Sequence, residues 1–124
     1  MMAGIQMSGS GESGFGITLS GFHCPTIEFG ARLHELEKKI VIKDFVQWED
    51  SGYITFIAMS RDTYAIPEER KIATFRREPH KFFQDLPKFL AGTRAQFIDR
   101  MVVTASMGSL SLTVLYRPVK SDGV

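Results

Sequence analysis

The spacing of apolar residues changes along this chain in an order that few folds can accommodate. Residues 15–19 alternate apolar with small or polar side chains, the period of two that is typical of a half-buried strand. Residues 26–40 then carry apolar side chains at steps of four, three and four, which predicts a helix with one apolar face. Residues 41–49 and 53–60 are rich in β-branched and aromatic side chains and flank a short turn sequence. This pattern predicts a β-hairpin.

The same order of patterns returns in the second half of the chain. Residues 71–77 predict a strand, and residues 79–98 predict a helix. Residues 101–107 and 109–117 predict a second hairpin around a glycine. Strand, helix, strand and strand therefore occur twice at nearly the same spacing, which favours a doubled βαββ unit.

Pro87 lies inside the second predicted helix. A proline there removes one backbone hydrogen bond, and its ring crowds the carbonyl four residues earlier. We therefore expect a short turn before Leu86 and the main helix after it, with Asp85 as a candidate cap.

The last predicted strand alternates most clearly. Its apolar side chains are expected to point inward beneath a helical layer, while its serine and threonine side chains face water. The inward set is Leu110, Leu112, Val114 and Tyr116, and the outward set is Ser109, Ser111 and Thr113. We expect a sheet with one dry face and one wet face.

These patterns predict one α+β domain over residues 15–118. It should contain five or six mostly antiparallel strands in a sheet, with two helices on one face. Either two βαββ halves, 15–61 and 71–118, or a ferredoxin-like sheet with an extra strand would satisfy the pattern. Residues 1–14, rich in glycine and serine, are expected to form a flexible leader, and residues 119–124 a short tail.

Composition indicates an ordinary globular protein. The chain has 124 residues, of which 44% are hydrophobic and 23% charged. A single cysteine, Cys24, excludes an internal disulfide, and no stretch approaches the roughly 18 apolar residues of a membrane span. No secretory signal pattern opens the sequence, so we expect an intracellular, cytoplasmic protein without a membrane partner.

The net charge of +1 conceals a division along the chain. Residues 1–69 carry five basic and ten acidic side chains, and residues 70–100 carry eight basic and three acidic ones. Such asymmetry suits either a polyanion site in the basic segment or oppositely charged surfaces that pair between copies.

Motifs that carry catalytic chemistry are absent or incomplete. Residues 9–14 match G-x-G-x-x-G as a string but precede a strand rather than a helix, so no dinucleotide site is expected. His34 and Glu35 begin an H-E-x-x-H pattern that lacks its second histidine, and His23 beside Cys24 would point away from it. We predict no catalytic residue, no metal site and no cofactor, and an enzyme is the third of three functional readings.

Aromatic and basic residues supply the two leading hypotheses. The first is a non-catalytic interaction or assembly subunit, a homo-oligomer or part of a protein complex, with large side chains as anchors. Its interaction candidates are Trp48, Tyr53 and Tyr116. The alternative is a single-stranded nucleic-acid-binding protein that uses the basic segment 70–100. Its polyanion-binding candidates are Arg70, Lys71, Arg76, Arg77 and Lys81.

Overall fold

Two βαββ units follow each other along the chain. The computed structural model describes residues 7–12, 17–61 and 70–119. In chain order the elements are β1 (Met7–Glu12), β2 (Ile17–Pro25), η1 (Thr26–Glu28), α1 (Phe29–Lys39), β3 (Asp44–Asp50), β4 (Tyr53–Arg61), β5 (Lys71–Arg77), α2 (Pro79–Thr93), β6 (Ala95–Ser106) and β7 (Ser109–Pro118). We call the unit from β2 to β4 module 1 and the unit from β5 to β7 module 2.

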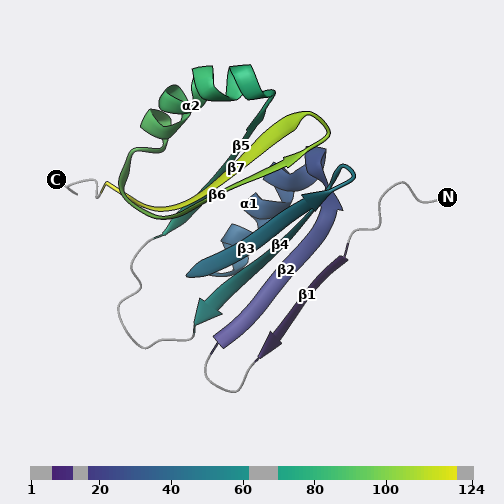
Figure 1. Ribbon diagram of the computed structural model, residues 1–124. Helices are drawn as coiled ribbons and strands as arrows, with labels where there is room; N and C mark the ends of the chain where they lie inside the picture. Colours follow the sequence, from purple (N-terminus) through teal and green to yellow (C-terminus); the bar gives the residue numbers. More distant parts are fainter. Residues whose placement is uncertain (1–6, 13–16, 62–69, 120–124) are drawn as a thin grey trace.

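The strands form two antiparallel sheets. Sheet A has the order β1-β2-β4-β3, and sheet B has the order β5-β7-β6. In both modules the third strand along the chain lies inside the sheet, between the first and the second (Figure 1). The structure confirms the α+β class with two helices and antiparallel strands. It has the tandem βαββ order rather than the ferredoxin-like one, and its strands divide into two sheets instead of forming one.

Equivalent residues of the two modules take equivalent places. Phe22 of β2 lies opposite Phe56 of β4, as Phe75 of β5 lies opposite Leu112 of β7. Each helix buries a phenylalanine in its first turns, and apolar positions follow at the same spacing. These positions are Phe29, Leu33 and Leu36 in α1, and Phe82, Leu86 and Phe89 in α2.

The two hairpin turns are also alike. Each turns through two residues with positive φ, the backbone geometry of the tight hairpins that match strand twist. The φ angles are 52° and 82° at Ser51 and Gly52, and 55° and 76° at Met107 and Gly108. Structure thus supports the doubling that the sequence pattern favours.

Each helix packs on one face of its own sheet, which we call the front face, and the opposite face is the back face. On the front of sheet A, the Phe29 ring of α1 lies 5.9 Å from Phe22 and 5.8 Å from Phe56 between centroids. On the front of sheet B, the Phe82 ring of α2 lies 5.3 Å from Phe75. The helix and front face therefore have the same relationship in both modules.

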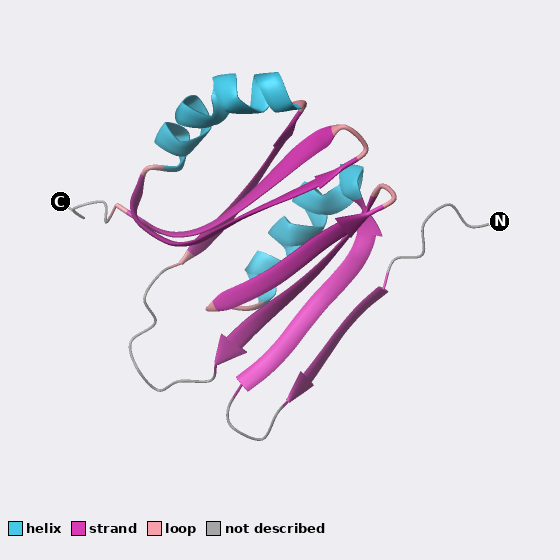
Figure 2. Ribbon diagram, in the orientation of Figure 1, coloured by secondary structure: helices cyan, strands magenta, loops and turns pink. Residues whose placement is uncertain are grey.

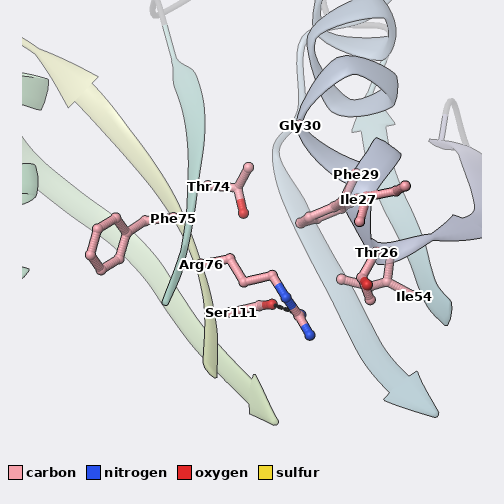
Figure 3. A pocket seen from close by; sticks show the side chains of 9 residues that line it. All are labelled: Thr26, Ile27, Phe29, Gly30, Ile54, Thr74, Phe75, Arg76 and Ser111. Atoms are coloured by element: carbon pink, nitrogen blue, oxygen red, sulfur yellow. Dashed lines mark hydrogen bonds between the residues drawn. The ribbon is translucent and has the colours of Figure 1, made fainter. Parts of the chain in front are cut away.

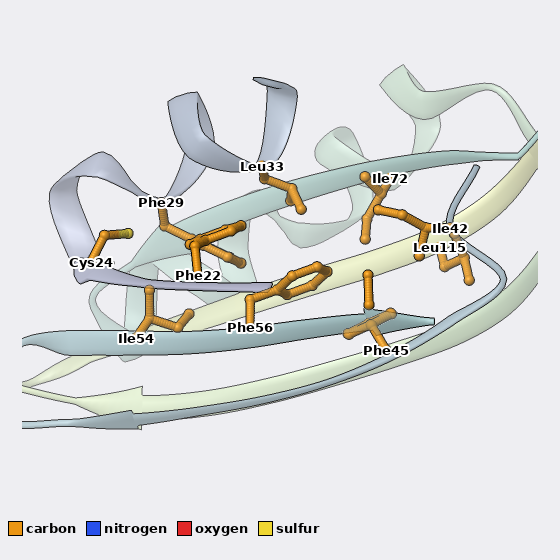
Figure 4. Packing of buried hydrophobic residues seen from close by; sticks show 11 residues of the cluster. Phe22, Cys24, Phe29, Leu33, Ile42, Phe45, Ile54, Phe56, Ile72 and Leu115 are labelled. Atoms are coloured by element: carbon orange, nitrogen blue, oxygen red, sulfur yellow. The ribbon is translucent and has the colours of Figure 1, made fainter. Parts of the chain in front are cut away.

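Module 2 stacks with its back face on the front of module 1. Ile72 and Leu115, from the back of sheet B, belong to the main core with Leu33 of α1 and Phe45 of β3 (Figure 4). β3 and β6 lie side by side, and α1 fills the space between the sheets (Figure 1). The layers therefore run sheet A, α1, sheet B and α2.

This stacking corrects the expectation of a wet face on the last strand. The inward set is buried as predicted, except that Leu110 is only half-buried. Ser111 and Thr113, expected to face water, are 2% and 0% exposed. They point to the back of sheet B, which module 1 covers.

The prediction that Pro87 divides the second helix is wrong. α2 runs unbroken over Pro79–Thr93, and Arg94 ends it in the left-handed conformation with φ 54°. Pro87 has no N–H to donate to the carbonyl of Phe83, four residues earlier. Both residues lie on the exposed side of α2, where water can reach that carbonyl. Residues 95–98, expected to be helical, begin β6.

Part of the expected leader is a strand. Residues 7–12 form β1, which pairs antiparallel with β2. Strand pairing uses backbone groups, so serine and glycine composition does not prevent it. Phe15 and residues 120–124 of the expected tail lie outside the described residues.

Candidate functional site

The back face of sheet A carries exposed apolar side chains. Leu19, Val46 and Trp48 point to this face and are 49%, 48% and 50% exposed. Within residues 7–12, 17–61 and 70–119, no helix lies on this side of sheet A (Figure 2). The equivalent face of sheet B is buried against module 1, so the two back faces differ in what covers them.

A shallow hollow of about 150 Å³ lies on this face, lined by Leu19, Asp44, Phe45, Val46, Ile57 and Met59. Gly21 lies between Leu19 and His23 on the same face of β2 and contributes no side chain. A Cβ there would collide with the backbone carbonyl oxygen of Phe56, so a larger residue requires the strands to shift. The back face therefore has a shallow apolar surface on which the side chain of Ile57 lies close to Gly21.

An ordered polar cluster borders the apolar part. The rings of His23 and Tyr53 stack at 5.3 Å between centroids with 7° between their planes. Nδ1 of His23 and Oγ1 of Thr55 share a hydrogen bond of 2.7 Å. These contacts hold the side chains in fixed positions, so this end of the face is preorganised.

A second exposed apolar row lies on the front of sheet B. Ile98, Met101 and Val103 of β6 are 41%, 47% and 52% exposed. α2 contacts β5 and β7, and β6 extends beyond the area that the helix covers. Contiguous exposed apolar surface on a protein often marks a binding site.

The three interaction candidates have different environments. Trp48 and Tyr53 both lie on the back face of sheet A, where Trp48 is half exposed and Tyr53 is partly buried. Tyr116 is 7% exposed on the front of sheet B. Only the first two are therefore placed to touch a partner in this structure.

The polyanion-binding candidates do not share one surface. Arg76 and Arg77 are adjacent in β5 and point to opposite faces of sheet B. Arg70 donates a hydrogen bond to the Lys43 carbonyl at 3.3 Å, and Arg77 lies 3.7 Å from the Asp85 carboxylate. Lys71 and Lys81 are exposed, one on β5 and the other on α2. A continuous basic groove is not formed by these five residues.

Arg76 lies in the interface between the modules. Its guanidinium donates hydrogen bonds to Glu49 at 2.9 Å, to the Ser111 hydroxyl and to the Ser106 carbonyl at 3.0 Å. The Glu49 side chain is 0% exposed, and the positive charge of Arg76 compensates its buried negative charge. A pocket of about 210 Å³ beside α1 exposes one side of this guanidinium (Figure 3). We therefore assign Arg76 to the internal contact rather than to a ligand.

Cys24 is a core residue at the end of β2. Its side chain is 0% exposed, and burial raises the pKa of the thiol to about 11. A protonated thiol is a poor nucleophile at neutral pH. His23 points to the other face of the strand, so the two adjacent residues do not form a pair.

Sequence reasoning did not identify Leu19, Val46, Met101 and Val103 as surface residues. The signal was present in β3 and β6, which carry apolar side chains at consecutive positions rather than at alternate ones. Such strands have apolar side chains on both faces, and one face can remain uncovered.

Comparison with known proteins gives no match: no family model, curated protein or solved structure corresponds to this chain. Among the residues that the structure describes, no helix is long and apolar enough to cross a membrane. The same residues contain no group of three histidine, cysteine or acidic side chains that could hold a metal ion.

Proposed function

We propose that this protein is a non-catalytic assembly subunit that self-associates through the back face of sheet A. One observation carries the proposal: Leu19, Val46 and Trp48 are each about half exposed on one sheet face that no described helix covers. Burial of such side chains is the main favourable term in most protein associations.

The composition of the face supports a protein partner. Its apolar centre lacks charged residues, and Asp44 and Asp50 lie at the two ends of β3. Interfaces commonly have an apolar centre that is depleted in charge and a polar rim. Large, stiff aromatic side chains such as Trp48 are frequent anchors in interfaces.

Sedimentation velocity at micromolar concentration tests the proposal. We expect the wild-type chain to form a defined oligomer, because none of the residues that the structure describes covers the face and contact with another copy would bury it. Trp48→Glu replaces a large apolar side chain of the face by a charge and should return the protein to a monomer.

Ile27→Glu is the matched control. Ile27 is 91% exposed in η1 and lies on neither sheet face, so this variant should assemble like the wild type. A wild-type monomer at every concentration, or an oligomer that Trp48→Glu leaves intact, would contradict the proposal.

A further inference from the structure

We infer that the partner is a second copy of this chain, whose sheet A back face packs on the front face of module 2. The inference rests on the proposed function and adds to it the surface of the second copy that the back face meets. It follows from the contact between the modules inside the chain, where the back of sheet B packs on the front of module 1. A second copy would repeat this contact between molecules.

The chain has one module contact and two free ends of the same kind. In the part of the chain that the structure describes, nothing covers the back face of module 1 or the front row on β6 of module 2. The two modules have the same strand order and helix position. Within one chain, the back of sheet B packs on module 1. In the proposed contact, the back of sheet A from a second copy packs on module 2 in the same way. Stacks of repeated units bury their faces in this way.

The exposed apolar rows are those that such stacking would bury. Within the chain, β6 uses its back face beside β3, where Gln47 donates a hydrogen bond to Thr104 at 3.3 Å. In the repeated contact, the back of β3 would lie beside the front of β6. Val46 and Trp48 would then meet Met101 and Val103, all between 47% and 52% exposed in the single chain.

Shape also agrees at the helix. In the chain, Gly30 of α1 approaches the back of sheet B, where a Cβ at Gly30 would lie 3.8 Å from Cγ2 of Thr74. Phe83 takes the equivalent position on α2, because it follows Phe82 as Gly30 follows Phe29, and it is 66% exposed.

On the back of sheet A, the residue equivalent to Thr74 is Gly21. Gly21 precedes Phe22 in β2 as Thr74 precedes Phe75 in β5. The repeated contact therefore places a protruding ring, Phe83, opposite a position without a side chain. In the contact inside the chain, the helix carries the small residue, Gly30, and the sheet carries the larger one, Thr74. Both arrangements let a helix approach a sheet closely.

Charge favours the same orientation. The exposed side of α2 carries Lys81 and Lys88, while Asp50 ends the back row of β3; Asp44, at its other end, pairs with Arg100 of the same chain at 3.5 Å. Opposite charges on the two surfaces favour contact between unlike faces over contact between like faces. Such a contact is heterologous, so it closes into a ring or extends as a filament.

A mixing experiment with two charge variants tests the inference. Val46→Lys blocks the back face, Met101→Lys blocks the front face, and the two positions are 48% and 47% exposed. We expect each variant alone to sediment as a monomer at concentrations where the wild type assembles. An equimolar mixture should give a 1:1 dimer and nothing larger, because each variant keeps one intact face.

The controls separate failure of the inference from failure of the proposed function. If Met101→Lys assembles like the wild type while Val46→Lys does not, copies meet back to back, and the inference is wrong while the proposed function stands. A mixture that stays monomeric also overturns the inference. If both variants assemble like the wild type, the back face is not used and both proposals fail. Should either variant lose its cooperative thermal transition, Trp48→Lys and Val103→Lys replace the pair.

Phe83→Ala provides an independent test of the helix contact. Truncation of an aromatic anchor in an interface should weaken self-association about 30-fold. Phe97→Ala is the matched control, because Phe97 is 57% exposed on the back of sheet B, where Arg117 lies over its ring at 5.2 Å. Equal effects of the two variants, or no effect of Phe83→Ala, would contradict this contact.

Discussion

Arg76 of β5 donates a hydrogen bond of 2.9 Å to the carboxylate of Glu49 on β3, and this ion pair joins the two modules. Thr104 of β6 donates a second hydrogen bond to Glu49 at 2.8 Å. A carboxylate with a fully buried side chain depends on such partners, because its charge is costly outside water. The position of module 2 on module 1 is therefore fixed by polar contacts as well as by apolar packing.

We predict that Arg76→Ala lowers the free energy of unfolding by about 3 kcal/mol, because it leaves the Glu49 charge buried without its cation. Arg77→Ala, at a half-exposed side chain, should change it by less than about 1 kcal/mol. Denaturant titrations of both variants measure the difference. Equal losses would contradict the role of Arg76, and the Arg76→Ala, Glu49→Ala double variant should lose less than the two single losses combined.

Gly21 permits the close approach of β2 and β4. We predict that Gly21→Ala destabilises the fold by about 1–3 kcal/mol, because the new Cβ would collide with the carbonyl oxygen of Phe56. Gly92→Ala is a control of opposite sign. Apart from its chain neighbours and the backbone of α2 itself, no atom lies within 4 Å of a Cβ at Gly92, so alanine there should stabilise the helix by about 0.5–1 kcal/mol. Thermal unfolding of both variants distinguishes the two effects, and a stabilising Gly21→Ala would contradict this packing.

The buried thiol of Cys24 should make the folded protein less stable in alkali. The thiol pKa is 9.0 in its ordinary state and about 11 in the folded protein, where burial disfavours the thiolate. Below pH 9 the thiol is protonated in both states and contributes no pH dependence. Between pH 9 and 11 the unfolded chain releases the proton and the folded chain retains it, so stability falls as pH rises. Guanidinium titrations across this range should show a steeper fall for the wild type than for Cys24→Ala, and parallel curves would contradict the assignment.

The order of elements could be predicted from sequence because the period of apolar residues is a local property. Residues 41–60 and 101–117 show their hairpins through strand-forming runs around glycine turns. The division into two sheets could not be predicted in this way, since it depends on which edges pair. β3 and β6 are edge strands that lie side by side without a shared ladder, and no residue pattern in either strand records that relationship.

Burial of polar residues was the main error of sequence reasoning. Ser111 and Thr113 read as water-facing because they alternate with apolar neighbours. Their face is covered by module 1, and Ser111 accepts a hydrogen bond there from Arg76. Polarity can therefore indicate a buried contact when the partner group comes from a distant part of the chain.

The candidate site was predictable in part. Trp48 and Tyr53 were identified from size and position near a hairpin tip, and the structure places both on one face. The sequence also predicts a polyanion site at Arg76, because adjacent basic residues suggest a charged surface. In a strand such neighbours point to opposite faces, and the partner of Arg76 is a glutamate 27 residues earlier in the sequence.

Acrylamide quenching of Trp48 fluorescence tests the central claim most directly, because Trp48 is the single tryptophan and lies on the back face of sheet A. We expect strong quenching at nanomolar concentration, where the half-exposed indole meets water. At tens of micromolar the quenching constant should fall several-fold as the face becomes buried, and Met101→Lys should remove this fall. The same quenching constant for the wild type at every concentration would contradict a docking role for this face.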